Sequence, residues 1–316
     1  MADTSIADAV RSLRLELSDP SRDLPRIAKD RAATPAISEA VRTLHTEHRI
    51  VLADAADPTM WRQLIGQVDL VVTSPPYWNL KEYSRRDGQL GSISDYEEFL
   101  DRLTPVWQAC YEALTPGGRL VIVVGDVCLS RRRNNGRHTV VPLHASIQEQ
   151  CRKIGLDNLA PIFWHKIANA RHESGGGSGA CLGKPYEPNS VLKNDIEYIL
   201  MQRKPGGYRS VPLENRVLSV IPKDVHSQWF RQIWDGPPGA STKQHPAPFP
   251  EELSDRLIRM FSFVGDTVLD PFMGSGTTLV SAAKWGRHSI GIDIEPAYVD
   301  MARERLEQMP NAWVLP

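Results

Sequence analysis

Apolar runs of four to six residues alternate with polar or glycine-rich turns over most of this chain. Val, Ile and Leu dominate these runs, which is typical of strands buried on both faces of a sheet. Strands are predicted at residues 48–52, 68–72, 119–124, 159–164, 196–201, 267–270 and 289–294. Between them, helical spacing predicts helices at residues 58–64, 96–114, 142–155 and 277–283. Strands that alternate with helices in this way predict an α/β fold with a doubly wound, mostly parallel sheet.

Residues 1–47 form an N-terminal extension with a different pattern. Ile6, Val10, Leu13 and Leu17 have helical spacing, Asp19-Pro20-Ser21 interrupts it, and a second helix is predicted at residues 37–44. The extension is expected to pack on the core, to pack on a second subunit, or to touch a partner of the protein. The sequence leaves these three roles open.

The composition fits one large α/β domain with an insertion, or two modest domains. The chain has 316 residues, of which 41% are hydrophobic and 24% charged. No run approaches the ~18 apolar residues of a membrane span, and the start of the chain lacks the apolar core of a secretory signal. The four cysteines and nine histidines are scattered, so neither a disulfide framework nor a metal site is predicted. A reducing cytoplasm is the expected location.

Positive charge is concentrated in the middle of the chain. The formal net charge is −1, yet the segment 129–225 contains fifteen Lys and Arg against eight Asp and Glu. Such a basic segment on an otherwise acidic protein favours contact with nucleic acid phosphates, although ordinary solvated charges are the alternative. Arg131, Arg132, Arg133 and Arg137 follow the strand at 119–124 and should lie on the rim of the sheet where ligands bind. Lys184 lies further along the same basic segment.

The stretch Thr73-Ser74-Pro75-Pro76-Tyr77-Trp78 follows the buried strand at 68–72. Two prolines cannot continue a central strand, so the chain must leave the sheet as a stiff loop. This loop offers the hydroxyl of Ser74, carbonyls without competing N–H donors at Pro75 and Pro76, and the aromatic faces of Tyr77 and Trp78. These groups suit an exocyclic amine on a flat heteroaromatic ring. A proline-rich turn with aromatic packing is the simpler interpretation.

A second strand–turn–helix unit lies near the C-terminus, at residues 267–283. Gly274 and Gly276 would let the backbone approach a ligand, and the helix N-terminus behind them favours a carboxylate. The next strand ends at Asp293, which is suited to bind ribose hydroxyls. Together the two units predict a site for a nucleoside cofactor.

These motifs resemble those of amino-group DNA methyltransferases. The resemblance rests on Ser-Pro-Pro-Tyr-Trp at 74–78, His-Pro-Ala-Pro-Phe-Pro at 245–250, and Asp-Pro-Phe-Met-Gly-Ser-Gly-Thr-Thr at 270–278, and it covers most of residues 48–308. The catalytic motif precedes the cofactor motif, as in the permuted β group. Ser74 resembles the branch that methylates cytosine N4, while adenine N6 enzymes share the architecture.

The resemblance implies a sheet of the seven-stranded methyltransferase type and S-adenosylmethionine as the cofactor. It implies that Asp270 and the turn 272–276 hold the methionine part, that Asp293 holds the ribose, and that Asp54 lies near the adenine. The whole set of implied cofactor residues is Asp54, Asp270, Pro271, Phe272, Gly274, Gly276, Thr277 and Asp293. The implied catalytic residues are Ser74, Pro75, Pro76 and Tyr77.

The expected partner is double-stranded DNA, contacted by Trp78, Arg131, Arg132, Arg133, Arg137 and Lys184. A cognate restriction endonuclease that acts separately is a further expected partner, and the protein is expected to be a monomer or a homodimer. Residues 48–165 and 244–316 should form the catalytic domain, and residues 166–243 the target-recognition region.

Two other functions are compatible with parts of this pattern. Methyltransferases that act on a glutamine amide in a protein use a similar loop, but there the cofactor motif normally comes first, and the basic segment would be unexplained. A DNA-binding module without catalytic activity is the second alternative. The intact loop at 74–77 and the intact turn at 270–278 argue against it.

Overall fold

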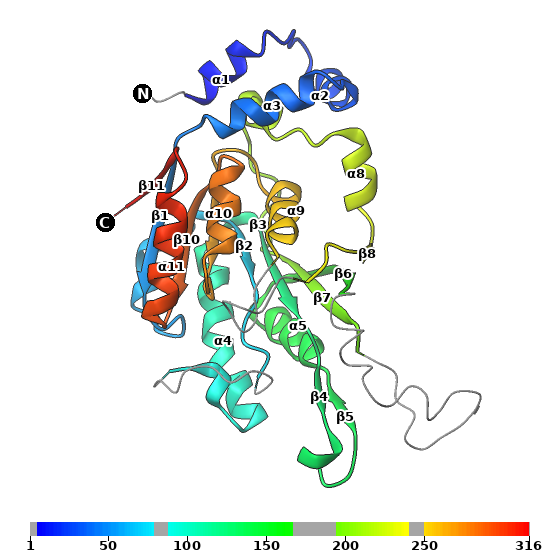
Figure 1. Cartoon of the computed structure of the whole chain (residues 1–316), viewed down its shortest axis with the longest axis vertical. Coiled ribbons are helices and arrows are strands. Elements are labelled where there is room, and N and C mark those ends of the chain that lie inside the picture. The colour runs from blue at the N-terminus through cyan, green and yellow to red at the C-terminus, as the bar shows by residue number, and fades with distance from the viewer. Residues whose placement is uncertain (1–4, 79–87, 167–193, 240–249, 316) are drawn as a thin grey trace, which may run out of the picture.

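The computed structural model of the chain describes residues 5–78, 88–166, 194–239 and 250–315. One sheet of nine strands organises these residues, in the order β11-β1-β10-β9-β2-β3-β7-β6-β8 (Figure 1). Its strands are β1 (Thr46–Leu52), β2 (Val68–Thr73), β3 (Leu114–Val124), β6 (Asp157–His165), β7 (Ile196–Arg203), β8 (Ile233–Asp235), β9 (Thr267–Asp270), β10 (His288–Asp293) and β11 (Ala312–Val314). All seven strands predicted from the sequence are confirmed, and β8 and β11 extend the sheet at its two edges.

Strand direction confirms the doubly wound, mostly parallel sheet. β7 runs antiparallel to its two neighbours, β3 and β6. The other neighbouring pairs are parallel. The carboxyl ends of β1, β10, β9, β2 and β3 therefore meet on one rim of the sheet, which is where such folds bind ligands.

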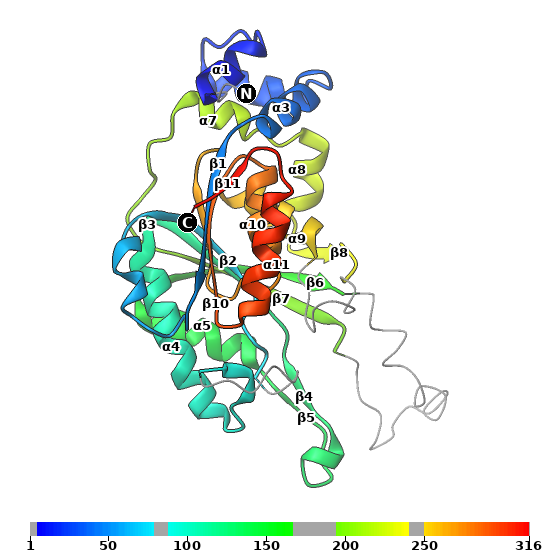
Figure 2. The same cartoon turned by 60° about the vertical axis from the view of Figure 1, so that its left-hand side comes forward.

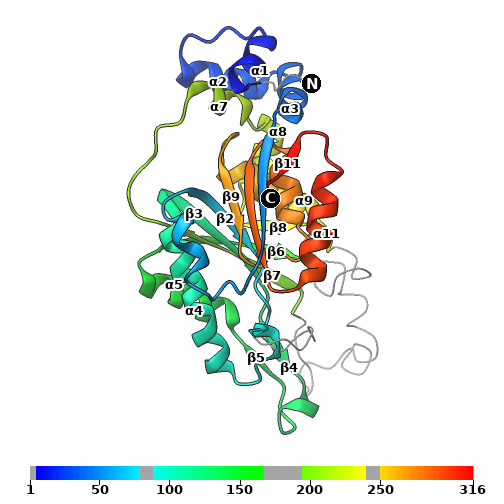
Figure 3. The same ribbon diagram turned by 90° about the vertical axis from the view of Figure 1, so that its left-hand side faces the viewer.

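Helices cover both faces of this sheet (Figure 3). The helices are α1 (Ile6–Ser12), α2 (Pro20–Lys29), α3 (Ala33–Arg42), α4 (Tyr96–Ala113), α5 (Leu143–Ile154), α7 (Leu213–Leu218), α8 (Lys223–Trp229), α9 (Glu251–Phe261), α10 (Thr277–Lys284) and α11 (Pro296–Glu307), with short 3₁₀ turns η1 (Met60–Leu64), η2 (Leu90–Ser92) and η3 (Arg131–Arg133). Alternate residues of β2 face the two layers: Val71 packs with α4 and α5, whereas Leu70 and Val72 pack with α9 and α10. This alternation follows from the two-residue period of a strand.

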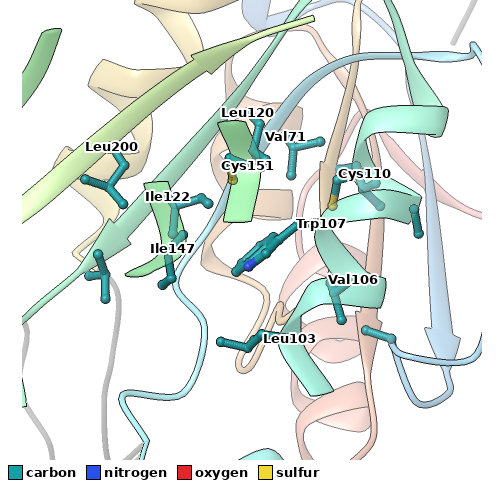
Figure 4. Close-up of a cluster of buried hydrophobic side chains, with 14 of the residues drawn as sticks. Val71, Leu103, Val106, Trp107, Cys110, Leu120, Ile122, Ile147, Cys151 and Leu200 are labelled. Carbon is teal, nitrogen blue, oxygen red and sulfur yellow. The ribbon is translucent and has the colours of Figure 1, made fainter. Parts of the chain in front are cut away.

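Helix α4 shows how the sequence sets these layers. Asp95 caps its N-terminus by accepting a hydrogen bond from the Glu98 amide at 2.9 Å, as predicted. Its apolar stripe then packs Leu103, Val106, Trp107 and Cys110 against Val71, Leu120 and Ile122 of the sheet (Figure 4). Trp107 is fully buried. Burial of a large aromatic side chain contributes about 2–3 kcal/mol to folding.

The N-terminal extension packs on the rest of the chain. Helices α1 and α3 are the predicted ones, and the break at Asp19 is the N-cap of α2, which the sequence pattern did not predict. Buried residues of all three helices, such as Val10, Ile27 and Val41, form one apolar cluster with Val217 of α7 and with Val264. Residues from two distant parts of the chain thus make a separate small core at the amino ends of the strands (Figure 1).

Several elements of the predicted target-recognition region, residues 166–243, pack with other parts of the fold. β7 and β8, which lie inside that range, are strands of the central sheet. α7, which also lies inside it, belongs to the N-terminal helical unit. The tract from 205 to 243 is therefore less irregular than its sequence suggested, because its apolar residues pack on two different cores.

A two-stranded hairpin projects from the carboxyl end of β3. It consists of β4 (Val127–Leu129) and β5 (Thr139–Val141), with η3 at its tip. In Figures 1 and 2 the hairpin lies at one end of the molecule and helices α1–α3 lie at the other. The arginine-rich tip is therefore far from the N-terminal unit.

Candidate active site

The two loops with predicted chemistry follow neighbouring strands of the sheet. β2 leads into the Ser74–Tyr77 loop, and β9, paired with it in parallel, leads into the turn that begins at Pro271. The two strand ends are also joined directly, because the Thr73 hydroxyl donates to Asp270 Oδ1 at 2.7 Å. Segments almost two hundred residues apart thus form one continuous edge.

Three polar groups lie around the Tyr77 hydroxyl. The Ser74 hydroxyl donates to it at 3.3 Å, and it can donate to Glu197 Oε2 at 3.2 Å or to the Val123 carbonyl at 3.3 Å. Pro75 is buried, and Ser74 and Tyr77 are half-buried. The loop therefore holds a hydroxyl on a stiff backbone segment at the edge of the core.

Glu197 and Lys166 are polar residues of this site that the sequence analysis missed. Glu197 lies at the start of β7, and Lys166 follows β6 and binds it, with 2.6 Å between Nζ and Oε1. Their side chains are only 12% and 26% exposed. An acidic residue inside the apolar run 196–201 was the available signal, but only the antiparallel pairing of β3 with β7 brings it beside Tyr77.

Trp78, predicted to contact DNA, is buried instead. Its side chain is 8% exposed and packs edge-on against Tyr96, with 5.2 Å between ring centroids. The residue has φ +48°, which turns the chain back toward the core. The indole therefore belongs to the core under the loop, and the prediction of a DNA contact is wrong for this structure.

Asp270 is a buried carboxylate that accepts hydrogen bonds from neighbouring residues of the two strand ends. Besides Thr73, it accepts hydrogen bonds from the Thr278 hydroxyl at 2.7 Å and from the Phe272 amide at 3.0 Å. Burial raises the pKa of Asp270 to about 6, although these hydrogen bonds oppose the rise. The Asp270 carboxylate therefore braces the turn that is expected to hold the methionine part.

Asp293 and Gly274 join the glycine turn to the end of β10. Asp293 Oδ2 accepts from the Gly274 amide at 2.9 Å, and Oδ1 accepts from the Glu295 amide at 2.9 Å. Gly274 has φ +50°, a conformation that favours glycine. Burial raises the pKa of Asp293. The carboxylate thus shapes the turn and closes the end of β10.

Gly276 lies where the turn packs closely against α11. A Cβ atom on Gly276 would lie 2.6 Å from the Cβ of Ala302 on α11, and φ is +76°. The glycine therefore allows α11 to approach the turn. Arg305 of α11 supports the same turn by donating to the Ser275 carbonyl at 2.7 Å and to the Thr277 hydroxyl at 3.1 Å. Thr277 is buried at the start of α10, and nothing in the sequence pattern pointed to Arg305.

The profile of the DNA methylase family matches residues 68–304, a range that contains both loops. The chain belongs to the DNA methylase family. It is 35% identical over 290 residues to the Type II methyltransferase M.MjaI of Methanocaldococcus jannaschii, covering 83% of this chain and 91% of that one. It is 32% identical to the Type II methyltransferase M.Cfr9I of Citrobacter freundii, covering 77% of this chain and 82% of the relative.

Solved structures extend the comparison. TTHA0409 of Thermus thermophilus, solved in complex with S-adenosyl-L-methionine, has a TM-score of 0.67 and 48% identity, and the match covers 86% of this chain and 98% of that one. The cytosine-N4-specific PvuII DNA methyltransferase has a TM-score of 0.55 at 19% identity, over 83% of this chain and 87% of that one. At that identity the second similarity concerns the fold alone.

The remaining predicted cofactor residues of this methylase lie along the same rim. Asp54 follows β1, is paired with Arg102 at 3.3 Å, and its carboxylate is 31% exposed. Pro271 is buried, while Phe272 is partly buried with its ring edge-on to Trp107 at 6.2 Å. Asp54 and Asp293 are brought together by the pairing of β1 with β10, in which Leu52 lies opposite Asp293.

The predicted DNA-contacting arginines lie on the β4–β5 hairpin of the methylase. Arg131, Arg132 and Arg137 are exposed, and within the described residues their side chains form no ion pair. Arg133 is the last residue of η3, directly after Arg132. Lys184 and residues 245–249 of the 245–250 motif lie outside the described residues, and Pro250 precedes α9. Where the chain is described, no group of three His, Cys, Asp or Glu side chains is arranged to hold a metal ion, and no helix could span a membrane.

Proposed function

We propose that this DNA methylase moves a methyl group to the N4 amine of a cytosine that has been flipped out of double-stranded DNA. The observation that carries the proposal is the position of the Ser74–Tyr77 loop beside the 270–276 turn, on strands joined by the Thr73–Asp270 hydrogen bond. A donor bound over the turn would face an amine bound at the loop. Holding two reactants in a reactive geometry before the reaction is a main source of the rate acceleration of enzymes.

The methyl donor is S-adenosylmethionine, which supplies an activated methyl group on a sulfonium sulfur. The site fits such a molecule: Gly274 has a left-handed backbone that only a residue without a side chain adopts easily, and the carboxylates of Asp293 and Asp54 follow neighbouring strands on the rim. Asp293 would accept the ribose hydroxyls, Asp54 would lie near the adenine, and the turn 272–276, which includes Phe272, would hold the methionine part. Asp270, Pro271, Gly276 and Thr277 would act by fixing the turn. The donor bound to TTHA0409 supports this assignment.

Ser74 and Pro75 would act on the target amine. Its lone pair is delocalised into the ring, which makes it a poor nucleophile. The Ser74 hydroxyl and the Pro75 carbonyl would accept its two hydrogens, favour a pyramidal nitrogen, and stabilise the positive charge that develops there. Pro76 would keep the loop stiff. Attack through nitrogen needs no thiolate, and burial raises the pKa of Cys151 to about 12.

The base must leave the duplex to reach this loop. Flipping costs roughly a few kcal/mol, and stacking on the Tyr77 ring would offset part of that cost. Arg131, Arg132, Arg133 and Arg137 of the hairpin would contact DNA phosphates, as would Lys184. A separate restriction endonuclease and a monomeric or dimeric state stay predictions. The Type II methyltransferases among the relatives support the former.

The assignment to cytosine rests on Ser74. The family includes adenine enzymes, and the choice of cytosine rests mainly on the resemblance of a serine at this position to the cytosine branch. A hydroxyl both accepts and donates, whereas a carboxylate only accepts, but this difference does not by itself exclude adenine. Mass spectrometry of nucleosides from DNA treated with the purified protein tests it. N4-methylcytosine is expected. N6-methyladenine would refute the assignment of the base but agree with the proposed mechanism. 5-Methylcytosine would refute both the base assignment and the mechanism.

A further inference from the structure

Glu197 is a largely buried carboxylate that lies between Tyr77 and Lys166 at the edge of the site. We propose that Glu197 accepts, through the hydroxyls of Tyr77 and Ser74, the proton that the target amine loses on methylation. The inference rests on the role proposed for Ser74 and adds a destination for the proton. Glu197 does not touch the base, so it is a positioning residue that acts through Tyr77.

Methylation of an amino group creates the need for such an acceptor. As the new N–C bond forms and the C–S bond of the donor breaks, the nitrogen gains a positive charge and keeps its two hydrogens. One of these protons must leave to give the neutral methylamino product. A flipped base on the Ser74–Tyr77 loop is shielded from bulk water, so a protein group has to receive the proton.

The hydrogen bonds around Tyr77 have the direction that this transfer requires. Ser74 donates to Tyr77, and Tyr77 can donate to Glu197, so the free lone pairs of Ser74 remain available to the amine. Moving one proton along each bond transfers the amine proton to Ser74, the serine proton to Tyr77, and the tyrosine proton to Glu197. Both hydroxyls end neutral, and the carboxylate becomes a carboxylic acid. The distances of 3.2 and 3.3 Å are of the loose kind that tightens when substrate binds.

Tyr77 has one hydroxyl proton, and among the residues that the structure describes two acceptors lie within reach of it. The Val123 carbonyl lies at 3.3 Å and the Glu197 carboxylate at 3.2 Å. A charged acceptor forms the stronger hydrogen bond, which favours donation to Glu197. The preferred hydrogen-bond direction therefore runs from Ser74 through Tyr77 to the Glu197 carboxylate.

Lys166 forms an ion pair with Glu197, the proposed proton acceptor. Its ammonium binds Oε1 of Glu197 at 2.6 Å, which leaves Oε2 for Tyr77. A cation at this distance favours the ionised carboxylate. The Lys166 ammonium also lies 5.3 Å from the centroid of the Trp164 ring, which is fully buried. The carboxylate thus lies between an ammonium group and the Tyr77 hydroxyl, with only 12% of its side chain exposed.

Other titratable groups lie on β6, β8, α5 and the segments next to β3 and β7. His165 lies 3.4 Å from Asp195 and also 3.4 Å from Asp235, and His144 lies 2.7 Å from Asp126. These groups are common to wild type and to the variants below. A change in the pH profile that is confined to variants of Glu197, Lys166 or Tyr77 therefore reports the proposed chain.

The test compares Glu197→Gln, Tyr77→Phe and the double variant with wild type in single-turnover methyl transfer to DNA. Each single change should lower the rate about 100-fold, a typical contribution of a proton-transfer group. Because both residues act in one chain, the rate of the double variant should fall by about the same factor as that of either single variant. The acid limb of the pH–rate profile should disappear in Glu197→Gln. In Lys166→Met it should move to higher pH, since the carboxylate is then easier to protonate.

A matched control neutralises another carboxylate on the same strand pair. Asp157 of β6 binds Arg203 of β7 at 2.9 Å at the opposite end of these strands. Asp157→Asn should keep the rate and the pH profile of wild type. A second readout needs no turnover: the ¹³Cζ signal of Tyr77, identified by its loss in Tyr77→Phe, should shift in Glu197→Gln and stay in place in Asp157→Asn.

Several outcomes would overturn the proposal. A rate for Glu197→Gln within threefold of wild type, a double variant about 10,000-fold slower, or an unmoved acid limb in Lys166→Met would each do so. Equal affinity of all variants for S-adenosylhomocysteine, measured by calorimetry, is expected, and a large loss would make Glu197 structural. Different results would refute the proposed function itself. These are a methylated base other than N4-methylcytosine, or a Ser74→Ala variant that stays fully active.

Discussion

The Thr73 hydroxyl donates a hydrogen bond to Asp270 Oδ1 at 2.7 Å, across the boundary between β2 and β9. Thr73 is the last residue of the strand before the Ser74–Tyr77 loop, and Asp270 is the last residue of the strand before the glycine turn. Both side chains are buried. The bond therefore fixes the distance between the place where a base would lie and the place where a methyl donor would lie.

Asp270→Asn should make the free energy of unfolding less dependent on pH between about 4 and 6. Burial raises the folded-state pKa of Asp270 from 3.8 to about 6, so in this window the folded state binds the extra proton. The contribution of Asp270 therefore favours folding at low pH, and up to about 3 kcal/mol of it is lost as the pH rises through the window.

Urea unfolding of both proteins at several pH values measures this effect. All other carboxylates are common to the two proteins, so the difference between their unfolding free energies isolates Asp270. Parallel curves for wild type and Asp270→Asn would contradict the assignment. Thr73→Val is the companion variant. It removes one hydrogen bond from a buried carboxylate and should cost about 1–3 kcal/mol at neutral pH.

Gly276→Ala should destabilise the protein by about 2–4 kcal/mol. The residue has φ +76°, where a side chain is strained, and its Cβ would lie 2.6 Å from the Cβ of Ala302. Ala302→Gly removes the atom it would meet, so the double variant should recover the part of the loss that comes from the contact. Chemical denaturation of the three variants gives the comparison. No recovery in the double variant would show that strain in the turn accounts for the whole cost.

The sequence predicted the framework of this site well because its chemistry is local. A double proline after a buried strand and glycines before a helix restrict the backbone within a few residues, so the positions of Ser74 and Asp293 followed directly. Glu197 and Arg305 could not be predicted, since each reaches the site only through pairing or packing with a distant element. The prediction for Trp78 failed for a related reason: its residue type is suited to ligand contact, but tertiary packing turns the ring toward Tyr96. The close packing of Gly276 on Ala302 also depends on a distant element and had no signal in the sequence.

Replacing Arg131, Arg132 and Arg133 by Ala should weaken DNA binding on all sequences and flatten its dependence on salt. The slope of log K against log salt should fall by about 0.9 for each phosphate that the protein no longer neutralises. Arg11, Arg26 and Arg42, on α1–α3 at the other end of the molecule, provide a control triple variant of equal charge (Figure 1). Fluorescence anisotropy at several salt concentrations gives both slopes. Equal slopes for the two triple variants would place the hairpin outside the DNA interface.

Ser74→Ala should slow methyl transfer far more than it weakens binding of DNA or of the methyl donor. Its hydroxyl would accept a hydrogen from an amine that is neutral before reaction and positive during it, so the hydrogen bond is strongest in the transition state. Loss of one such preorganised group typically costs about 100- to 1000-fold in rate. Ser74→Thr, which keeps a hydroxyl at the same place, should recover part of the rate. Single-turnover kinetics with binding titrations of both ligands separates the two effects. A variant whose rate is unchanged while DNA affinity falls would instead make Ser74 a binding residue, because only an interaction specific to the transition state lowers the rate without changing affinity.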